Sequence, residues 1–406
     1  MKSKEYKQLF YPRTDEIRQE ICNHFSDNGH RSPGILPFLP FYVEELGATP
    51  LTYGLILASF SLLQFISAPI MGRLSDHYGR RPMLIFSQMS TCLSFIILAF
   101  ADNIWLVFLS RIVDGMLGSN FTIAQAYISD ISSKKDRSKA FGIGGIAFGA
   151  GFLIGPAIGG TLAGISHSIP SFLAAGASFM TILMTMFLLP ETVKKKKNIS
   201  FRIREAFHFR DYKKYFSMPK ISGRLWQYFS FALTHTMYVT SFAFFVERVL
   251  NFNSSNVGFL LTYVGFVSII FRGTLLSRLI DRFGEKKLRY AGVIFILLAM
   301  LNMIFLRQWW LFLVTMTLFS VGAGMAMPLL AGSVSRAVSP KEQGAIMGLV
   351  GSMMSISQII GPLIGNALIH YFFPGSLGIA AAVTISVAFM LMLREDSKKN
   401  AKKMIA

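Results

Sequence analysis

Arg111 and Asp114 are the residues whose chemistry stands out first, because both lie inside the apolar run VFLSRIVDGMLGSN. A charged side chain near the middle of a bilayer costs about 2.5–3.5 kcal/mol on insertion scales, and such charges usually mark function. A spacing of three puts the two side chains on one face of a helix. A desolvated carboxylate takes up a proton readily and a nearby guanidinium opposes this, so a pair that separates between two conformations can bind and release a proton. The alternative is a permanent, purely structural ion pair.

The surrounding chain is that of a membrane protein. Of its 406 residues, 52% are hydrophobic and only 15% are charged, and the apolar residues form runs long enough to cross ~30 Å of hydrocarbon as helices. The chain is therefore predicted to be an all-α polytopic membrane protein. A twelfth candidate span, residues 33–43, is too short to cross alone. The eleven predicted spans are 50–72, 82–101, 103–127, 139–164, 169–190, 224–247, 254–278, 288–306, 309–335, 343–371 and 372–393.

The net charge of +19 is explained by topology. Six alternate loops and tails hold 30 of the 40 Lys and Arg residues, which predicts that these segments are cytoplasmic. No basic face is interleaved with aromatic residues, so a nucleic-acid partner is not expected. Cys22 and Cys92 lack metal or disulfide spacing, and no cofactor, metal site or enzymatic constellation is predicted. No cleavable signal peptide is visible, because the first thirty residues lack an apolar core.

Two sequence motifs occur twice, which indicates a duplicated bundle. GRLSDHYGRRPML is echoed by SRLIDRFGEKKL, and Asp76 and Asp281 are separated by 205 residues; GFLIGPAIGG is echoed by SQIIGPLIGN, and Gly155 and Gly361 are separated by 206. We therefore predict two halves of six helices. The expected segments are an atypical polar segment (1–32), a first bundle (33–193), a basic cytoplasmic linker (194–223), a second bundle (224–393) and a cytoplasmic tail (394–406).

The first repeated motif lies in a loop between two helices, and its residue types indicate which contacts it could make. Its residues are Gly72, Asp76, Gly79, Arg80 and Arg81, and the second-half echo retains Asp281, Arg282 and Gly284. A small residue at the start lets its helix approach a helix of the other half. The acidic residue can then lie near the positive N-terminal end of that helix, and the arginines can pair with carboxylates or lipid phosphates. The alternative is a basic turn that only fixes orientation.

The second motif lies in a glycine-rich stretch, GIGGIAFGAGFLIGPAIGG. Each glycine inside a helix costs about 0.5–1 kcal/mol relative to alanine. Glycines at four-residue spacing form a groove in which a facing helix lies close, and a proline bends the helix. Such a helix is suited to sliding against its partner, whereas the alternative reading is simple tight packing. The motif residues are Gly142, Gly151, Gly155, Pro156, Gly159 and Gly160.

On these motifs, from about Gly34 to the C-terminus, the chain resembles the major facilitator superfamily, and most closely its proton-coupled drug antiporters, which include the tetracycline efflux pumps. The resemblance implies twelve nominal helices in two six-helix halves around a central cavity. It implies that the loop motif latches the cytoplasmic side, that Arg111 takes part in proton coupling, and that the glycine motif favours export. The chain departs from the family at His77, where Arg or Lys is usual, and at Asp114, where Gln is frequent; the role of Asp114 is our inference from its position.

The function predicted is export of small amphipathic compounds in exchange for protons by a monomer in a bacterial inner membrane, with a cytoplasmic C-terminus. Alternatives are a metabolite or sugar facilitator or symporter, or a non-transporting relative, because the charged residues before 33 cannot cross lipid as an exposed helix. Arg272 is expected to extend to the membrane interface. Six residues are candidates for the cavity wall or, equally, for hydrogen bonds between helices: Gln64, Gln125, Gln227, His235, Tyr238 and Gln358.

Overall fold

The computed structural model describes residues 38–132, 151, 154–166, 168–193, 214–339 and 342–405. Within these ranges the structure is helical and contains no strand. The helices of the first half are α3 (Leu39–Glu45), α4 (Pro50–Tyr78), α5 (Arg80–Ala99), α6 (Ile104–Leu117), α7 (Asn120–Ile131), the short helix Ile154–Ala163 and α9 (Ser168–Leu188). Those of the second half are α11 (Pro219–Leu250), α12 (Ser254–Ile270), η2 (Phe271–Leu275), α13 (Leu276–Phe283), α14 (Glu285–Phe305), α15 (Trp309–Ser335), α16 (Gln343–Tyr371) and α17 (Gly375–Ile405).

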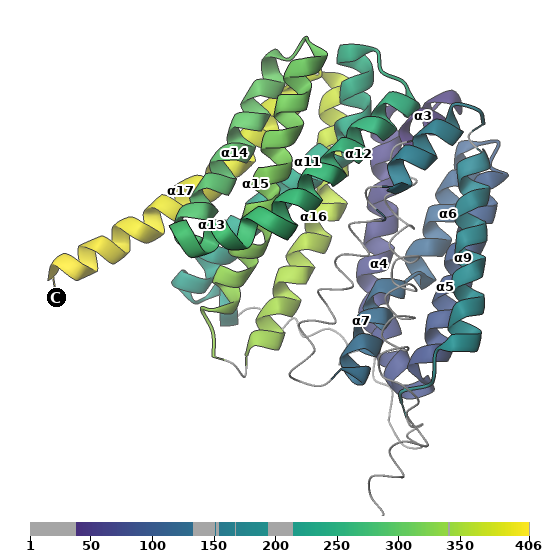
Figure 1. Cartoon of the computed structure of the whole chain (residues 1–406), viewed down its shortest axis with the longest axis horizontal. Helices are drawn as coiled ribbons and strands as arrows, with labels where there is room; N and C mark the ends of the chain where they lie inside the picture. Colours follow the sequence, from purple (N-terminus) through teal and green to yellow (C-terminus); the bar gives the residue numbers. More distant parts are fainter. Residues whose placement is uncertain are drawn as a thin grey trace, which may run out of the picture.

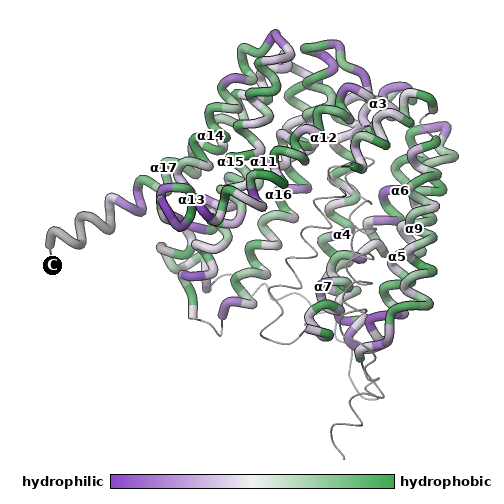
Figure 2. Tube along the Cα trace, in the orientation of Figure 1, coloured by the Kyte–Doolittle hydropathy of each residue, from purple (hydrophilic) through white to green (hydrophobic). Residues whose placement is uncertain are grey.

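The predicted helical membrane architecture is confirmed. Ten helices are long and apolar enough to cross a membrane in the described ranges, and each coincides with a predicted span. Figure 2 shows apolar residues along most of these helices and hydrophilic residues at several turns and in the short helix α13. Of the eleventh predicted span, 139–164, residues 139–150 lie outside the described residues and residues 154–163 form the short helix.

The structure corrects one predicted span and adds detail near both ends of the chain. The span predicted as 103–127 is interrupted, because α6 ends at Leu117 and α7 begins at Asn120. The segment 394–405, predicted to be a tail, continues α17 as helix, and Figure 1 shows this helix projecting beyond the bundle. The atypical N-terminal segment, 1–32, lies outside the described residues, as do residues 33–37, and the seven-residue helix α3 overlaps the short candidate span 33–43.

Side-chain caps fix where several helices begin. The hydroxyl of Thr49 accepts a hydrogen bond from the backbone N–H of Thr52 at 3.2 Å, and the side chains of Asn103 and Asn253 cap α6 and α12 in the same way. These residues satisfy N–H groups that a helix start leaves without a partner. All three caps lie at one end of the bundle, which we call the Gly54 end; we call the opposite end, where α4 finishes, the Asp76 end.

Two close backbone approaches join the halves near the Gly54 end. A Cβ placed on Gly54 of α4 would lie 2.7 Å from the carbonyl oxygen of Pro362 in α16. A Cβ on Gly160 would lie 3.0 Å from the Cα of Gly258 in α12. Glycine is therefore required at both positions, since any side chain would push the helices apart. The two contacts are related by the internal repeat, because each joins a repeated Gly-Pro helix to a helix of the other half (Figure 1).

Candidate functional site

Arg111 and Asp114 lie together in α6 but are only loosely paired. Their closest charged atoms, Nη1 and Oδ2, are 4.0 Å apart, and their side chains are 9% and 12% exposed. The hydroxyl of Thr91 donates to Oδ1 of Asp114 at 2.8 Å, and Nη2 of Arg111 donates to the hydroxyl of Ser94 at 3.0 Å. Each charge is thus held mainly by a hydroxyl of α5, so the pair can separate without leaving either group unsolvated.

The interruption of the helix directly follows this pair. A Cβ on Gly118 would lie 2.4 Å from Oδ1 of Asp114, so glycine is needed there to make room for the carboxylate. Two side chains of α4 satisfy carbonyls near the interruption: Ser67 donates to Met116, and Gln64 donates to Gly118 at 3.5 Å. Such partners are what a broken helix requires in lipid. Gln64 is therefore a hydrogen-bond donor between helices.

Several neighbours of the pair were missed by the sequence analysis. The amide of Asn120 donates to the hydroxyl of Thr91 at 2.8 Å, and the guanidinium of Arg111 lies 5.7 Å from the ring centroid of Phe95. A signal was present, because Thr91 and Ser94 lie three residues apart in a predicted span. Hydroxyls at that spacing share a helix face, and a polar face inside a membrane usually meets other polar groups.

The loop motif forms a cluster of charges around Arg80, which is 8% exposed. Its guanidinium forms an ion pair with Asp76 and donates to Asp130 of α7 at 2.9 Å and to the hydroxyl of Ser75 at 2.6 Å. The expected pairing of an arginine with carboxylates is therefore present. All these partners belong to the first half, so in this conformation the cluster joins α4, α5 and α7 to one another.

Glu191 completes this cluster and was not identified from the sequence. Its carboxylate accepts hydrogen bonds from the backbone N–H groups of Arg80 at 2.9 Å and Arg81 at 3.2 Å, at the start of α5. A carboxylate is favourable there because the N-terminal end of a helix is positive. Gly79 has φ of 109°, and a Cβ on it would lie 2.3 Å from Glu191 Oε2. Gly79 is thus required both by its backbone conformation and by the carboxylate beside it.

Two expectations about the loop motif differ from the structure. The nearest neighbour of a Cβ on Gly72 is Thr122 of α7, at an ordinary 3.7 Å, so Gly72 faces a helix of its own half and not of the other half. In the second half, Gly284 retains a positive φ of 78°, but Asp281 and Arg282 are exposed. The echo preserves the turn and does not enclose a buried arginine.

The glycine motif reaches the other half at its last residue. Gly142 lies outside the described residues, whereas Gly151, Pro156, Gly159 and Gly160 are buried and Gly155 is half-buried. The hydroxyl of Ser255 in α12 donates to the carbonyl of Gly160 at 3.1 Å, and a Cβ on Gly258 would lie 2.5 Å from the carbonyl oxygen of Pro156. A facing helix thus approaches the motif closely at Gly160 and Pro156, whereas the groove was expected at Gly151, Gly155 and Gly159.

The six candidate cavity residues have different surroundings. Gln227 is fully buried in the second half, and its amide donates to Glu395 of α17 at 3.3 Å, so it connects helices as Gln64 does. Gln125 and Gln358 are exposed. His235 and Tyr238 of α11 pack on Phe319 of α15, with ring centroids 5.6 and 4.1 Å apart.

Arg272 does not extend to the interface as expected. Its Nε lies 3.5 Å from the Cβ position of Gly324, a buried residue of α15. Gly324 precedes Arg336 by twelve residues, which is about 18 Å along a helix, and Arg336 forms an ion pair with Glu285 at the Asp76 end. The guanidinium therefore lies beside α15, away from the Asp76 end, and its side chain is exposed.

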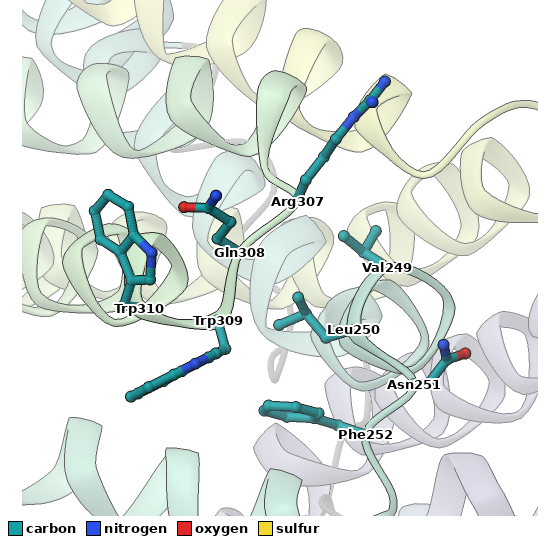
Figure 3. A pocket seen from close by; sticks show the side chains of 8 residues that line it. All are labelled: Val249, Leu250, Asn251, Phe252, Arg307, Gln308, Trp309 and Trp310. Atoms are coloured by element: carbon teal, nitrogen blue, oxygen red, sulfur yellow. The ribbon is translucent and has the colours of Figure 1, made fainter.

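A hollow of about 420 Å³ opens at the Gly54 end between the turns that follow α11 and α14. Figure 3 shows that Arg307 points away from the indoles of Trp309 and Trp310. Those indoles are 60% and 53% exposed, as is typical of tryptophans at a membrane–water boundary. We assign this region to membrane anchoring. Its lining residues are Val249, Leu250, Asn251, Phe252, Arg307, Gln308, Trp309 and Trp310.

Comparison with known proteins identifies the family. The family model described as Major Facilitator Superfamily matches residues 21–307 and 227–404. The chain belongs to the major facilitator superfamily. Tetracycline resistance protein, class B, of Escherichia coli is 31% identical, over 90% of this chain and 94% of that protein. Multidrug resistance protein 2 of Bacillus subtilis is 26% identical, over 90% and 92%.

Solved structures agree with this fold. A POT family transporter in complex with 5-aminolevulinic acid has a TM-score of 0.78 at 12% identity, over 95% of this chain and 96% of that one. The human organic anion transporter MFSD10 has a TM-score of 0.69 at 21% identity, over 94% and 100%. The major facilitator chain described here is thus a multi-pass membrane transporter and not an enzyme, and its curated relatives include tetracycline and multidrug resistance proteins.

Proposed function

We propose that this transporter exports small amphipathic compounds across a bacterial inner membrane in exchange for protons. The matched relatives support drug export, since they include proteins named for resistance to tetracycline, to multiple drugs and to quinolones. Beyond what these names say, the proposal specifies the direction of transport, the coupled ion and the residues that carry the proton.

The observation that carries the proposal is the environment of Asp114. Among the described residues, it is the only acidic side chain that is buried, and its distance of 4.0 Å from Arg111 is at the limit of an ion pair. A carboxylate kept ionised by a loosely held cation takes up a proton when that cation moves away. Protonation of Asp114 would then accompany the movement of Arg111 between the two ends of the transport cycle.

Alternating access requires the halves to close at one end at a time. The basic loops lie at the Asp76 end, which is therefore assigned to the cytoplasm, together with the C-terminus. The close approaches at Gly54 and Gly160 lie at the opposite end, and the ion pairs of Arg80 lie within the first half. We infer a conformation that is closed toward the outside, with the loop motif released from the second half.

The experiment reconstitutes the purified chain in liposomes with a pH gradient and follows lumenal pH while tetracycline, norfloxacin or ethidium is added. The wild-type chain should show drug-induced proton movement. Arg111→Ala and Asp114→Asn should lose it, because either change removes one member of the pair. Asp102→Asn, an exposed carboxylate two residues before α6, is the matched control and should behave as the wild type.

Two other results would replace the proposal. Drug or metabolite flux that does not depend on the pH gradient would indicate a facilitator of the same superfamily. A folded protein that moves none of the compounds would favour a non-transporting relative, and would direct attention to the N-terminal region before residue 33. Proton movement that persists in Asp114→Asn would exclude Asp114 as the proton carrier.

A further inference from the structure

Helix α5 presents a row of hydroxyl groups to α6. The two helices lie side by side in the first half (Figure 1), and the hydroxyls of Ser90 and Ser94 donate to the carbonyls of Val113 at 3.0 Å and Ser110 at 2.8 Å. Thr91 lies between these serines in the sequence and is 3% exposed. Of the three hydroxyls, that of Thr91 is the one that donates to a carboxylate, the side chain of Asp114.

Two acceptors lie within reach of the Thr91 hydroxyl. Its oxygen is 2.8 Å from Oδ1 of Asp114 and 3.2 Å from the backbone carbonyl oxygen of Ser87, one turn earlier in α5. A bond from a threonine to the carbonyl four residues before it is ordinary in a helix. A hydroxyl has a single hydrogen, so it donates to one of the two acceptors at a time. Rotation about the Cβ–Oγ1 bond therefore moves this hydrogen between the carboxylate and the carbonyl.

Asn120 holds the oxygen of this hydroxyl. It is the first residue of α7, and its amide donates to Oγ1 of Thr91 at 2.8 Å. This bond occupies one lone pair of the threonine oxygen and leaves the other available. The second lone pair can accept a hydrogen from Asp114 when that carboxyl is protonated. Thr91 can thus satisfy Asp114 in either of its charge states.

The charged and titratable groups around Asp114 leave this contact to Thr91. Arg111, on the same helix, approaches the other carboxylate oxygen, Oδ2, at 4.0 Å. Tyr53 of α4 interacts electrostatically with Arg111. Helices α5 and α7 contribute neutral groups, the hydroxyl of Thr91 and the amide of Asn120. A change of charge at Oδ1 is therefore received first by Thr91.

We propose that Thr91 is the positioning residue for proton uptake by Asp114. While Asp114 is ionised, the Thr91 hydroxyl donates to Oδ1. When Oδ1 takes a proton from water, the new O–H group donates to Oγ1 of Thr91, and the hydroxyl hydrogen of Thr91 turns to the carbonyl of Ser87. No buried donor or acceptor loses its partner in this exchange, so the carboxyl changes its charge at small cost. The inference rests on the proposed proton coupling and adds to it the group that stabilises Asp114 in its neutral state.

The test observes the carboxyl of Asp114 directly and does not depend on transport. Infrared difference spectra of the full chain in lipid nanodiscs are recorded from about pH 4 to about pH 10, and the protonated-carboxyl band that is lost in Asp114→Asn is assigned to Asp114. Thr91→Val keeps the shape of the side chain and removes the hydroxyl. It should raise the pH midpoint of the band by about one unit, because the ionised carboxylate loses the stronger, charge-assisted hydrogen bond. The band should also move to higher frequency, because the neutral carboxyl no longer donates to Thr91.

Further variants separate this result from a general disturbance of the bundle. Thr91→Ala also lacks the hydroxyl and should give the same two shifts, whereas Thr91→Ser should restore the wild-type midpoint and frequency. Asn120→Ala should raise the midpoint less than Thr91→Val does, because the hydroxyl remains. Thr181→Val is the matched control, since this fully buried threonine of α9 donates to the carbonyl of Ser178 at 2.8 Å. It should leave the Asp114 band unchanged.

Three results would overturn the proposal. They are a wild-type midpoint and frequency in Thr91→Val, a Thr91→Ser variant that does not restore them, and a wild type in which Asp114 gives no band. Drug-induced proton movement in liposomes reports export separately. Its absence in a chain whose Asp114 band shifts as expected would refute the export proposal and would still support the role of Thr91.

Discussion

Asp114, which is only loosely paired with Arg111, could carry the proton or could position the helices. A single substitution distinguishes these two functions. Asp114→Asn keeps the shape of the side chain and its contact with Thr91, and removes the titrating group. We expect exchange of labelled for unlabelled tetracycline across proteoliposomes to continue, while uphill transport driven by a pH gradient falls to background. Loss of both activities in a folded variant would mean that Asp114 positions the helices and does not carry the proton.

Glu44 of α3 predicts how stability depends on pH. Burial, followed by a hydrogen bond to Glu247 of α11, raises the pKa of Glu44 from 4.5 to about 8, and Arg248 opposes this shift. One oxygen of Glu247 is buried without a donor among the described residues, so a proton shared by the two carboxyl groups would satisfy it. Because the folded protein binds this proton more tightly than the unfolded chain, the stabilisation is complete below about pH 4.5 and is lost as pH rises through about 8.

The corresponding measurement is the thermal unfolding midpoint between pH 4.5 and 9. We expect the midpoint of the wild type to fall over this interval, and Glu44→Gln to flatten this fall, because glutamine imitates the protonated carboxyl. Glu45→Gln, at the exposed neighbouring position, is the control and should retain the wild-type pH profile. An identical pH profile for Glu44→Gln and the wild type would contradict the shared proton.

Gly79 is constrained by its positive φ and by the carboxylate of Glu191. The two constraints can be measured separately. Gly79→Ala forces a side chain into a positive-φ conformation and toward Glu191, and should lower the free energy of unfolding by about 1–3 kcal/mol. Gly284 has a similar conformation, but nothing lies within 4 Å of its Cβ position. Gly284→Ala should therefore cost only the backbone strain. Equal losses in thermal denaturation would show that Glu191 does not constrain the loop.

At the scale of the element, the interruption between α6 and α7 is the feature with the clearest consequence. The carbonyls near it accept hydrogen bonds from Ser67 and Gln64 of α4, so the interruption is stabilised by a neighbouring helix and is not a frayed end. Gly118 itself has no need of a positive φ, because its φ is −79°. Its small size leaves room for both the carboxylate and the backbone carbonyl oxygen of Asp114, each 2.4 Å from its Cβ position.

Gly118→Ala should therefore act through Asp114. The new methyl group would displace the carboxylate from Thr91, and we expect proton-coupled transport to fall by roughly tenfold or more, since an oriented charged hydrogen bond is worth ~1.5–3 kcal/mol. Gly176→Ala, in α9 with nothing within 4 Å of the Cβ position, is the matched control. Full coupling in Gly118→Ala would show that the orientation of Asp114 is unimportant.

At the scale of the whole molecule, the contact between Gly160 and Gly258 predicts which conformation is favoured. Gly160→Val places two methyl groups against the backbone of α12, so the halves should separate at the Gly54 end and close at the Asp76 end. In a Cys22→Ser, Cys92→Ser background, spin labels at Glu45 and Phe373 should move apart. Labels at Tyr78 and Arg282 should approach each other in the same variant.

The control for this movement is Gly223→Val in α11, where nothing lies within 4 Å of the Cβ position. It should leave both distances as in the wild type. If Gly160→Val lengthened neither distance at the Gly54 end, the glycine contact would be ordinary packing without influence on the conformational equilibrium. That outcome would favour the simpler interpretation of the glycine motif, which is tight packing between helices.

The sequence by itself determined the membrane class, the position of most spans, the duplication, and the family with its motif residues. These follow from local properties, since hydropathy, charge placement and repeated spacing can be read along a single segment. Asp114 could also be selected in this way, because a carboxylate inside an apolar run is unusual wherever the helix lies in space.

The tertiary structure alone decided which side chains meet. Glu191 reaches Arg80 across 111 positions of the chain, Thr91 reaches Asp114 across 23, and Gly160 faces Gly258 of the other half. Arg272 lies in a π turn of one helix and beside Gly324 of another. Such contacts depend on how helices rotate and pack against distant partners, and a periodic apolar sequence allows many rotations. Only the packed bundle selects one of them.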